Sequence, residues 1–254
     1  MNSAQRLENI FIQLRSAQPP NSIPNTPPTG VDAWSSIFGR HRESGQDLDD
    51  IGSECARAVG QELIHLNQLL REHGIPDAIH ADHLANLRSI ASTRYLHGNW
   101  QSMASLVKEE YLTSLKWAGY VLGSDASSDA EAQIDALAEQ IDQLISEVTA
   151  SALPLTLRRF VLRNLQSIRD ALWRYKVAGA GPLREAMQGI NGTPASELNS
   201  VRSAAQGLPE AEAGILQRVG AMITTVANVC DVATKLDGGF GLAKAAAKAL
   251  GYTG

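Results

Sequence analysis

Cysteine is scarce in this sequence. Cys55 and Cys230 are the two cysteines among 254 residues, and they are too few and too far apart to form a disulfide framework or a metal site of paired cysteines. We therefore expect a chain whose thiols stay reduced and whose setting is cytoplasmic.

Long apolar runs are also missing. The most suggestive uncharged stretch near the C-terminus covers residues 219–230, whereas a transmembrane helix needs about 20 apolar residues. At the N-terminus, Arg6, Glu8 and Arg15 interrupt apolar residues that recur at helical spacing. The sequence therefore predicts neither a stable transmembrane span nor a signal peptide.

Positive charge is not in excess. The chain carries 22 Lys and Arg against 27 Asp and Glu, which gives a net charge of -5. A surface of this balance does not attract nucleic acid in general, and no nucleic-acid-binding motif is present, so we do not expect nucleic acid as a partner. With 44% hydrophobic and 19% charged residues, the chain has the composition of a folded globular protein.

Catalytic signatures are absent from the sequence. It contains no phosphate-binding Walker loop, no Gly-x-Ser-x-Gly turn and no His-Glu-x-x-His zinc motif. The Gly-Gly-Phe-Gly stretch at residues 238–241 lacks the preceding strand and the third glycine of a dinucleotide-binding loop. We therefore predict no catalytic residue and no cofactor.

Helical periodicity is what the sequence has instead. Apolar residues recur every three or four positions from Leu48 to a glycine stop at Gly74, and again in segments that begin near Asp77 and near Asn99, the last running to Gly123. No segment shows the two-residue alternation of a strand. The predicted fold class is all-α, a multi-helix bundle with two long central antiparallel helices and no significant β-sheet.

A proline-rich segment separates the N-terminal residues from the rest. Half of the ten prolines fall between Pro19 and Pro28, which predicts an extended connection. Asp32 is placed to cap a short helix that carries Trp34 and Phe38. We expect these aromatic side chains to dock on the body and to act as a clamp. The alternative is that residues 1–32 form a mobile arm.

The breaks in periodicity divide the chain into five parts. They are an N-terminal helix (1–16), a proline-rich linker (17–32), a first helical bundle (33–123), a charge-segregated hairpin with short helices (124–206), and Gly/Ala-rich C-terminal helices (207–254). Residues 33–254 are also compatible with a single domain. Within the last part, residues 242–250 predict a small, weakly amphipathic helix behind a glycine hinge.

Two of the expected helices, residues 131–150 and 154–176, have apolar stripes of similar length. Ile141 and Ile168 lie near the middle of these stripes. A short turn joins the two segments, so they are expected to pack as an antiparallel pair along a buried seam.

The same two segments differ in charge, since the first lacks Lys and Arg and the second is rich in arginine. In an antiparallel hairpin, residues equally far from the turn lie at the same level. Glu147 is then level with Arg158, and Asp142 with Arg163. The expectation is that the helices select each other in part by charge.

Three of these arginines point away from the apolar stripe of their helix. Arg159, Arg163 and Arg174 fall on the outer face, and Trp173 lies between the arginine rows. Such a surface suits an acidic protein partner or a phosphate-bearing ligand. The alternative is that the arginines serve as structural ion-pair partners.

The six histidines all lie between residues 41 and 97. Near the turn at residue 74, His73, Asp77, His80 and His83 have spacings that place ligand-type side chains on one helix face. They are the candidate metal ligands. The alternative is that they face solvent or cap helix ends.

The predicted function is that of a non-enzymatic helical protein that acts through protein–protein interaction, with an acidic protein as the favoured partner and self-association also compatible. A different class is a membrane-active or membrane-docking effector whose C-terminal residues 211–254 detach and insert. A helical, metal-dependent enzyme is the third reading.

Overall fold

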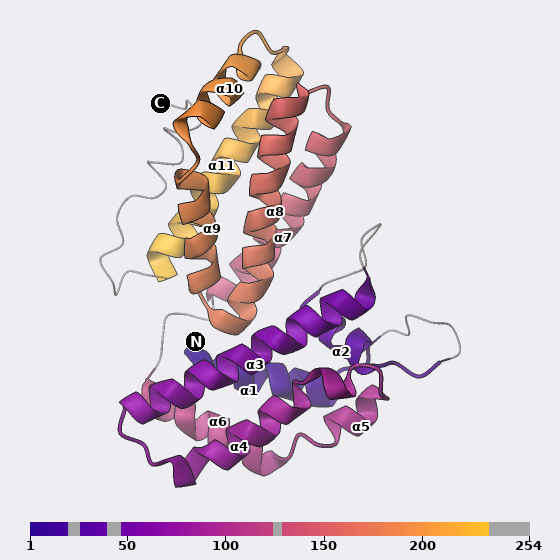
Figure 1. The fold of residues 1–254 in the computed structure, drawn as a ribbon, viewed down its shortest axis with the longest axis vertical. Helices are drawn as coiled ribbons and strands as arrows, with labels where there is room; N and C mark the ends of the chain where they lie inside the picture. The colour runs from indigo at the N-terminus through magenta and orange to yellow at the C-terminus, as the bar shows by residue number, and fades with distance from the viewer. Residues whose placement is uncertain (20–25, 40–46, 124–128, 234–254) are drawn as a thin grey trace. The chain divides into compact units, whose positions relative to one another are not determined.

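The computed structural model describes residues 1–19, 26–39, 47–123 and 129–233. In these ranges the chain is helical and contains no strand, so the all-α class is confirmed (Figure 1). One isolated bridge pairs Thr29 with Asn99. None of the described helices is long and apolar enough to cross a bilayer.

The helices form two compact units, each of which we describe by itself. Unit 1 is Met1–Ala126 with Lys176–Gly179, and unit 2 is Ser127–Tyr175 with Ala180–Gly254. The helices of unit 1 are α1 (Ser3–Ser16), α2 (Gly30–Ile37), α3 (Leu48–Glu72), α4 (Asp77–Ile90), the short 3-10 helix η1 (Thr93–Tyr95), α5 (Trp100–Ala104) and α6 (Glu109–Leu122). The helices of unit 2 are α7 (Asp129–Ala150), α8 (Leu155–Ala178, whose last turn belongs to unit 1), α9 (Gly181–Asn191), α10 (Ala195–Ala205) and α11 (Glu210–Ala233).

Helix α3 is the centre of unit 1, and α1, α2 and α4 pack against it. Its apolar stripe is buried from Ile51 to Leu70. The helix stops at Gly74, whose φ of 74° is open to glycine at little cost. The next amide, of Ile75, donates to the carbonyl of Leu70 at 3.0 Å, which is the bond that ends a helix in a Schellman motif. The predicted glycine stop is therefore where the sequence places it.

One side chain, Asn2, joins the start of α1 to the end of α6. Its Oδ1 accepts a hydrogen bond from the amide of Gln5, as an N-cap does. Its Nδ2 donates to the carbonyl of Gly119 at 2.8 Å and to that of Gly123. Asn2 therefore satisfies an orphan donor of one helix and orphan acceptors of another.

The clamp helix α2 docks as expected, but its cap differs from the prediction. Trp34 is fully buried, makes an edge contact with Phe11 and stacks on Phe38, with ring centroids 6.4 Å apart in each pair. The N-cap is Thr29, and Asp32 is the third helical residue of a capping box, accepting from the Thr29 amide at 2.7 Å. The prediction that Asp32 caps the helix was wrong by three residues. Residues 20–25 of the proline-rich segment lie outside the described residues.

The single helix predicted from Asn99 to Gly123 is two helices, α5 and α6. Lys108 between them has extended backbone angles, φ -78° and ψ 153°. Val107 is buried at the break, and Glu109 and Glu110 follow in the first turn of α6. Acidic side chains at this position favour a new helix start through the helix dipole, so the chain gains a second N-terminus there.

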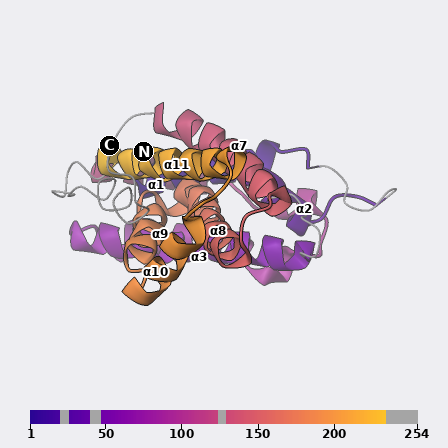
Figure 2. The same cartoon turned by 90° about the horizontal axis from the view of Figure 1, so that it is seen from above.

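Unit 2 is a helical bundle around one hydrophobic core (Figures 1 and 2). Ile141 on α7 and Ile168 on α8 are both fully buried and belong to one hydrophobic core, to which α9 and α11 also contribute. The expected antiparallel pair is thus present. Helix α11 packs closely on α7, a long-range neighbour that the charge pattern of the hairpin did not predict.

Candidate binding surface on helix α8

The outer face of α8 presents the three predicted arginines. Arg159, Arg163 and Arg174 are all exposed, whereas the apolar positions of the same helix are buried in the core of unit 2. A helix turns by about 100° per residue, so these arginines cannot share the side of the apolar stripe. The predicted direction of the arginines therefore agrees with the structure.

Arg163 is held in place by two neighbours. Its Nη2 donates to Oε1 of Glu197 on α10 at 2.7 Å, and its guanidinium lies 5.5 Å from the ring centroid of Phe160. Both partners limit the rotamers of a long side chain, so less conformational entropy is lost when a ligand engages it.

Arg159 lies one turn from Leu155 on the same face. Among the residues that the structure describes, no carboxylate forms an ion pair with Arg159. Leu155 is 53% exposed, one of the large apolar side chains that solvent reaches. Arginine is enriched among the residues that contribute most to binding at protein interfaces, and the exposed leucine beside it adds apolar area that a partner would bury.

Trp173 differs from the prediction. It is 7% exposed and therefore no part of an open aromatic surface. The guanidinium of Arg174 lies over its ring at 5.5 Å. The surface thus consists of arginines with Leu155, and its aromatic contribution comes from buried rings, Phe160 and Trp173, beneath the guanidinium groups.

The ion pairs of the hairpin also differ from those expected. Asp142 accepts from Arg169 at 2.7 Å, not from Arg163. Glu147 pairs with Arg218 of α11 at 2.7 Å, not with Arg158, which instead donates to the carbonyl of Ser151. Equal height alone does not determine the partner, because Arg163 lies on the outer face of α8, as expected, and the less exposed Arg169 reaches Asp142 instead.

The histidine positions do not converge. Asp77 accepts two hydrogen bonds from Arg71, both 2.8 Å long, which hold the pKa of Asp77 below its usual value. His73 contacts the carbonyl of Leu69, and His83 lies against the ring of Tyr111. Within the described ranges, no three His, Cys, Asp or Glu side chains are grouped as metal ligands.

His80 is the exception in being buried, at 1% exposure. Neither ring nitrogen has a hydrogen-bond partner in the described part of the chain, and the nearest carboxylate oxygen, on Asp77, is 3.9 Å from Nε2. Such a group weakens a fold, since an apolar side chain of similar size avoids the desolvation of two nitrogens.

Replacing His80 with Leu is therefore expected to leave the free energy of unfolding unchanged or to raise it by about 1 kcal/mol, as measured by urea denaturation. The control is His73→Leu at an exposed helix end, which should change stability by less than about 0.5 kcal/mol. A loss of more than about 1 kcal/mol in His80→Leu would show that the ring is satisfied in solution.

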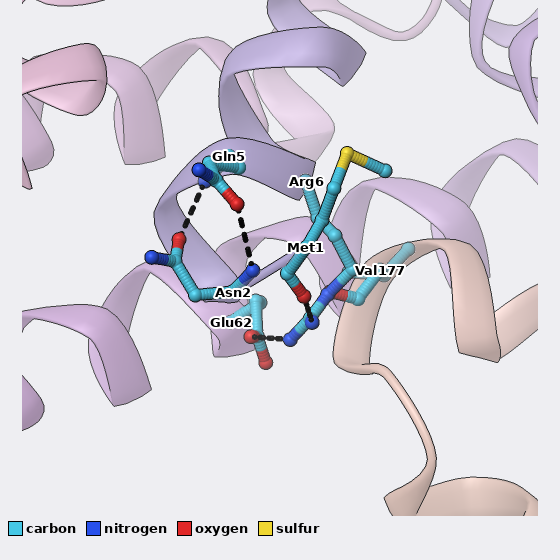
Figure 3. Close-up of polar contacts among 6 residues, drawn as sticks. All are labelled: Met1, Asn2, Gln5, Arg6, Glu62 and Val177. Atoms are coloured by element: carbon cyan, nitrogen blue, oxygen red, sulfur yellow. Dashed lines mark hydrogen bonds and ion pairs between the residues drawn. The ribbon is translucent and has the colours of Figure 1, made fainter. Parts of the chain in front are cut away.

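A buried ion pair in unit 1 is a feature that the sequence analysis missed (Figure 3). The Nη2 of Arg6 on α1 donates to Oε1 of Glu62 on α3 at 3.1 Å, and the two side chains are 12% and 7% exposed. Arg6 also donates to the carbonyls of Met1 at 2.7 Å and Val177 at 2.9 Å (Figure 3). The available signal was a glutamate next to Leu63 within the apolar stripe of a long helix.

Arg6 therefore donates hydrogen bonds both to Glu62 and to a carbonyl at the C-terminal end of α8. A cation at a helix C-terminus is favourable because the last carbonyls carry partial negative charge. The following residue in the turn, Gly179, has a φ of 68° and packs so closely on the guanidinium that an added Cβ would lie 3.0 Å from it. Arg6 thus has a structural role, in which it holds α1 against Glu62 of α3 and the last turn of α8.

Comparison with known proteins gave no match to a protein-family model, to a curated protein or to a solved structure.

Proposed function

We propose that this chain acts by binding an acidic protein partner through the outer face of α8. The observation that carries the proposal is Arg159, which is exposed, has no ion-pair partner among the described residues and lies beside the exposed Leu155. A guanidinium donates two parallel hydrogen bonds to a carboxylate, and burying an adjacent leucine adds apolar contact area.

The neighbouring arginines support the same partner. Arg163 is oriented by Glu197 and Phe160, and Arg174 is oriented by Trp173. The carboxylate of Glu197 is half-buried, and a partner carboxylate would compete with it for Arg163. The favoured partner is therefore a helical segment with an apolar residue and carboxylates one turn apart, which would pack against Arg159, Arg163 and Leu155.

The test uses a triple variant, Arg159→Glu, Arg163→Glu and Arg174→Glu. The probe is a fluorescent helical peptide with glutamates at four-residue spacing around a leucine, and binding is measured by anisotropy. The triple variant is expected to weaken binding at least ten-fold, because each attraction becomes a repulsion. Exposed ion pairs contribute little, so its free energy of unfolding should fall by no more than about 1 kcal/mol.

A matched control changes the exposed Arg57, Arg88 and Arg202 to Glu, which alters the net charge equally at other places. This control should bind the peptide like the unaltered chain. If both variants bound the peptide equally weakly, the loss of binding would come from the overall charge of the chain, which would contradict the proposal. Loss of the fold in the α8 variant, with Arg→Lys substitutions restoring it, would identify the arginines as structural ion-pair partners.

A further inference from the structure

A groove of about 290 Å³ lies in unit 2, between α7 and α11. Each helix lines it with four residues at the spacing of one helix face. They are Gln140, Gln143, Leu144 and Glu147 on α7, and Arg218, Ala221, Met222 and Thr225 on α11. Since Glu147 pairs with Arg218, the two helices run antiparallel past each other.

The shape of the groove follows from side-chain size. Leu144 and Met222 are buried and form an apolar floor. Ala221 is small and leaves the space above that floor open to solvent. The ion pair between Glu147 and Arg218 occupies one end. A seam between two antiparallel helices accepts a third helix where a small side chain, here Ala221, leaves its apolar floor open.

The charge beside the groove is negative. On α7, Glu139 is exposed next to the lining residue Gln140, and residues 133–150 contain no Lys or Arg. Arg218, the cation among the lining residues, is neutralised by Glu147. A basic helix with small contact residues is thus the complement of this groove in both charge and shape.

The chain itself contains a sequence of that description. Residues 242–250 read Leu-Ala-Lys-Ala-Ala-Ala-Lys-Ala-Leu, with Lys244 and Lys248 one turn apart and alanines between them. They lie outside the described residues, which end at Ala233. We propose that residues 242–250 of the same molecule occupy the α7–α11 groove as a basic, alanine-rich helix.

The connection is long enough for this. Helix α11 ends at Ala233, and the near end of the groove, at Thr225, lies about 12 Å back along the helix at 1.5 Å per residue. Residues 234–241 can span up to about 26 Å. A tethered segment has an effective concentration in the millimolar range, so even a weak contact is populated. Occupancy by this segment excludes other helices from the groove.

The test is disulfide trapping in the full-length chain with Cys230 replaced by Ser, Cys55 being buried. Ala221→Cys is combined in turn with Ala245→Cys, Ala246→Cys and Ala247→Cys, and the rate of bond formation is measured under mild oxidation. A bound helix turns about 100° per residue, so one position should react about ten-fold faster than the slowest. Glu139→Lys should slow that reaction, and adding Lys244→Glu should restore it.

The matched control places the first cysteine at Gln166, which is exposed on the outer face of α8. There the three tail positions should react slowly and at equal rates. Equal rates of the three positions with Ala221→Cys would overturn the proposal, because a free tether has no preferred face. A disulfide between two chains would also overturn it, since the occupant would then be the tail of a second copy.

Discussion

Replacing Ile141 with Asp is expected to lower the free energy of unfolding of unit 2 by about 4 kcal/mol or more. Ile141 is fully buried and shares a core with Ile168, Leu144 and Leu172. The substitution removes apolar contacts and brings a carboxylate into a region without partners for it, and these two costs add. Hydrogen exchange of the α7 and α8 amides, together with urea denaturation, measures the loss in the unit concerned.

The control for this experiment is Ala136→Asp on the exposed face of α7. It introduces the same charge into the same helix and should change stability by less than about 0.5 kcal/mol. Ile141→Val, which removes one methylene, should cost about 1 kcal/mol. If Ile141→Asp behaved like the surface control, the seam between α7 and α8 would not be buried in solution.

Replacing Glu62 with Leu is expected to cost unit 1 about 3–5 kcal/mol. The change leaves the guanidinium of Arg6 buried without a counter-charge, and an uncompensated buried charge is among the most destabilising groups in a protein. Thermal and urea denaturation, with hydrogen exchange of the α1 and α3 amides, measures the effect.

The double variant Arg6→Met with Glu62→Leu should be more stable than Glu62→Leu alone, because both charges leave the interior together. It will not reach the stability of the unaltered chain, since the carbonyls of Met1 and Val177 lose their donor. A double variant as unstable as the sum of the two single variants would mean that Arg6 and Glu62 do not interact.

Most helices could be predicted from local patterns in the sequence. The apolar stripe of α3 and the glycine at residue 74 are adjacent in sequence, and a glycine that ends a helix needs no distant partner to do so. The stripes of α7 and α8 likewise predicted the burial of Ile141 and Ile168. Within single helices, the spacing of apolar residues was sufficient.

Pairings between helices could not be obtained in the same way. Asp142 pairs with Arg169, and Glu147 pairs with Arg218. Which arginine each carboxylate meets depends on the face that each helix turns to its neighbour and on the position of α11. The sequence distance between Glu147 and Arg218 contains three other helices. Trp173 shows the same limit, because its place in the interior depends on tertiary neighbours and not on its own helix.

Asn2 has a consequence for the time at which unit 1 can form. Its contact with Gly119 joins residues 117 positions apart, so α1 obtains this partner only after almost the whole unit has been synthesised. At about 5–20 residues per second, translation of that interval takes roughly 6–23 s. During that time the side of α1 that packs on α6 lacks its partner. A nascent chain is therefore expected to expose this face to chaperones until α6 emerges from the ribosome.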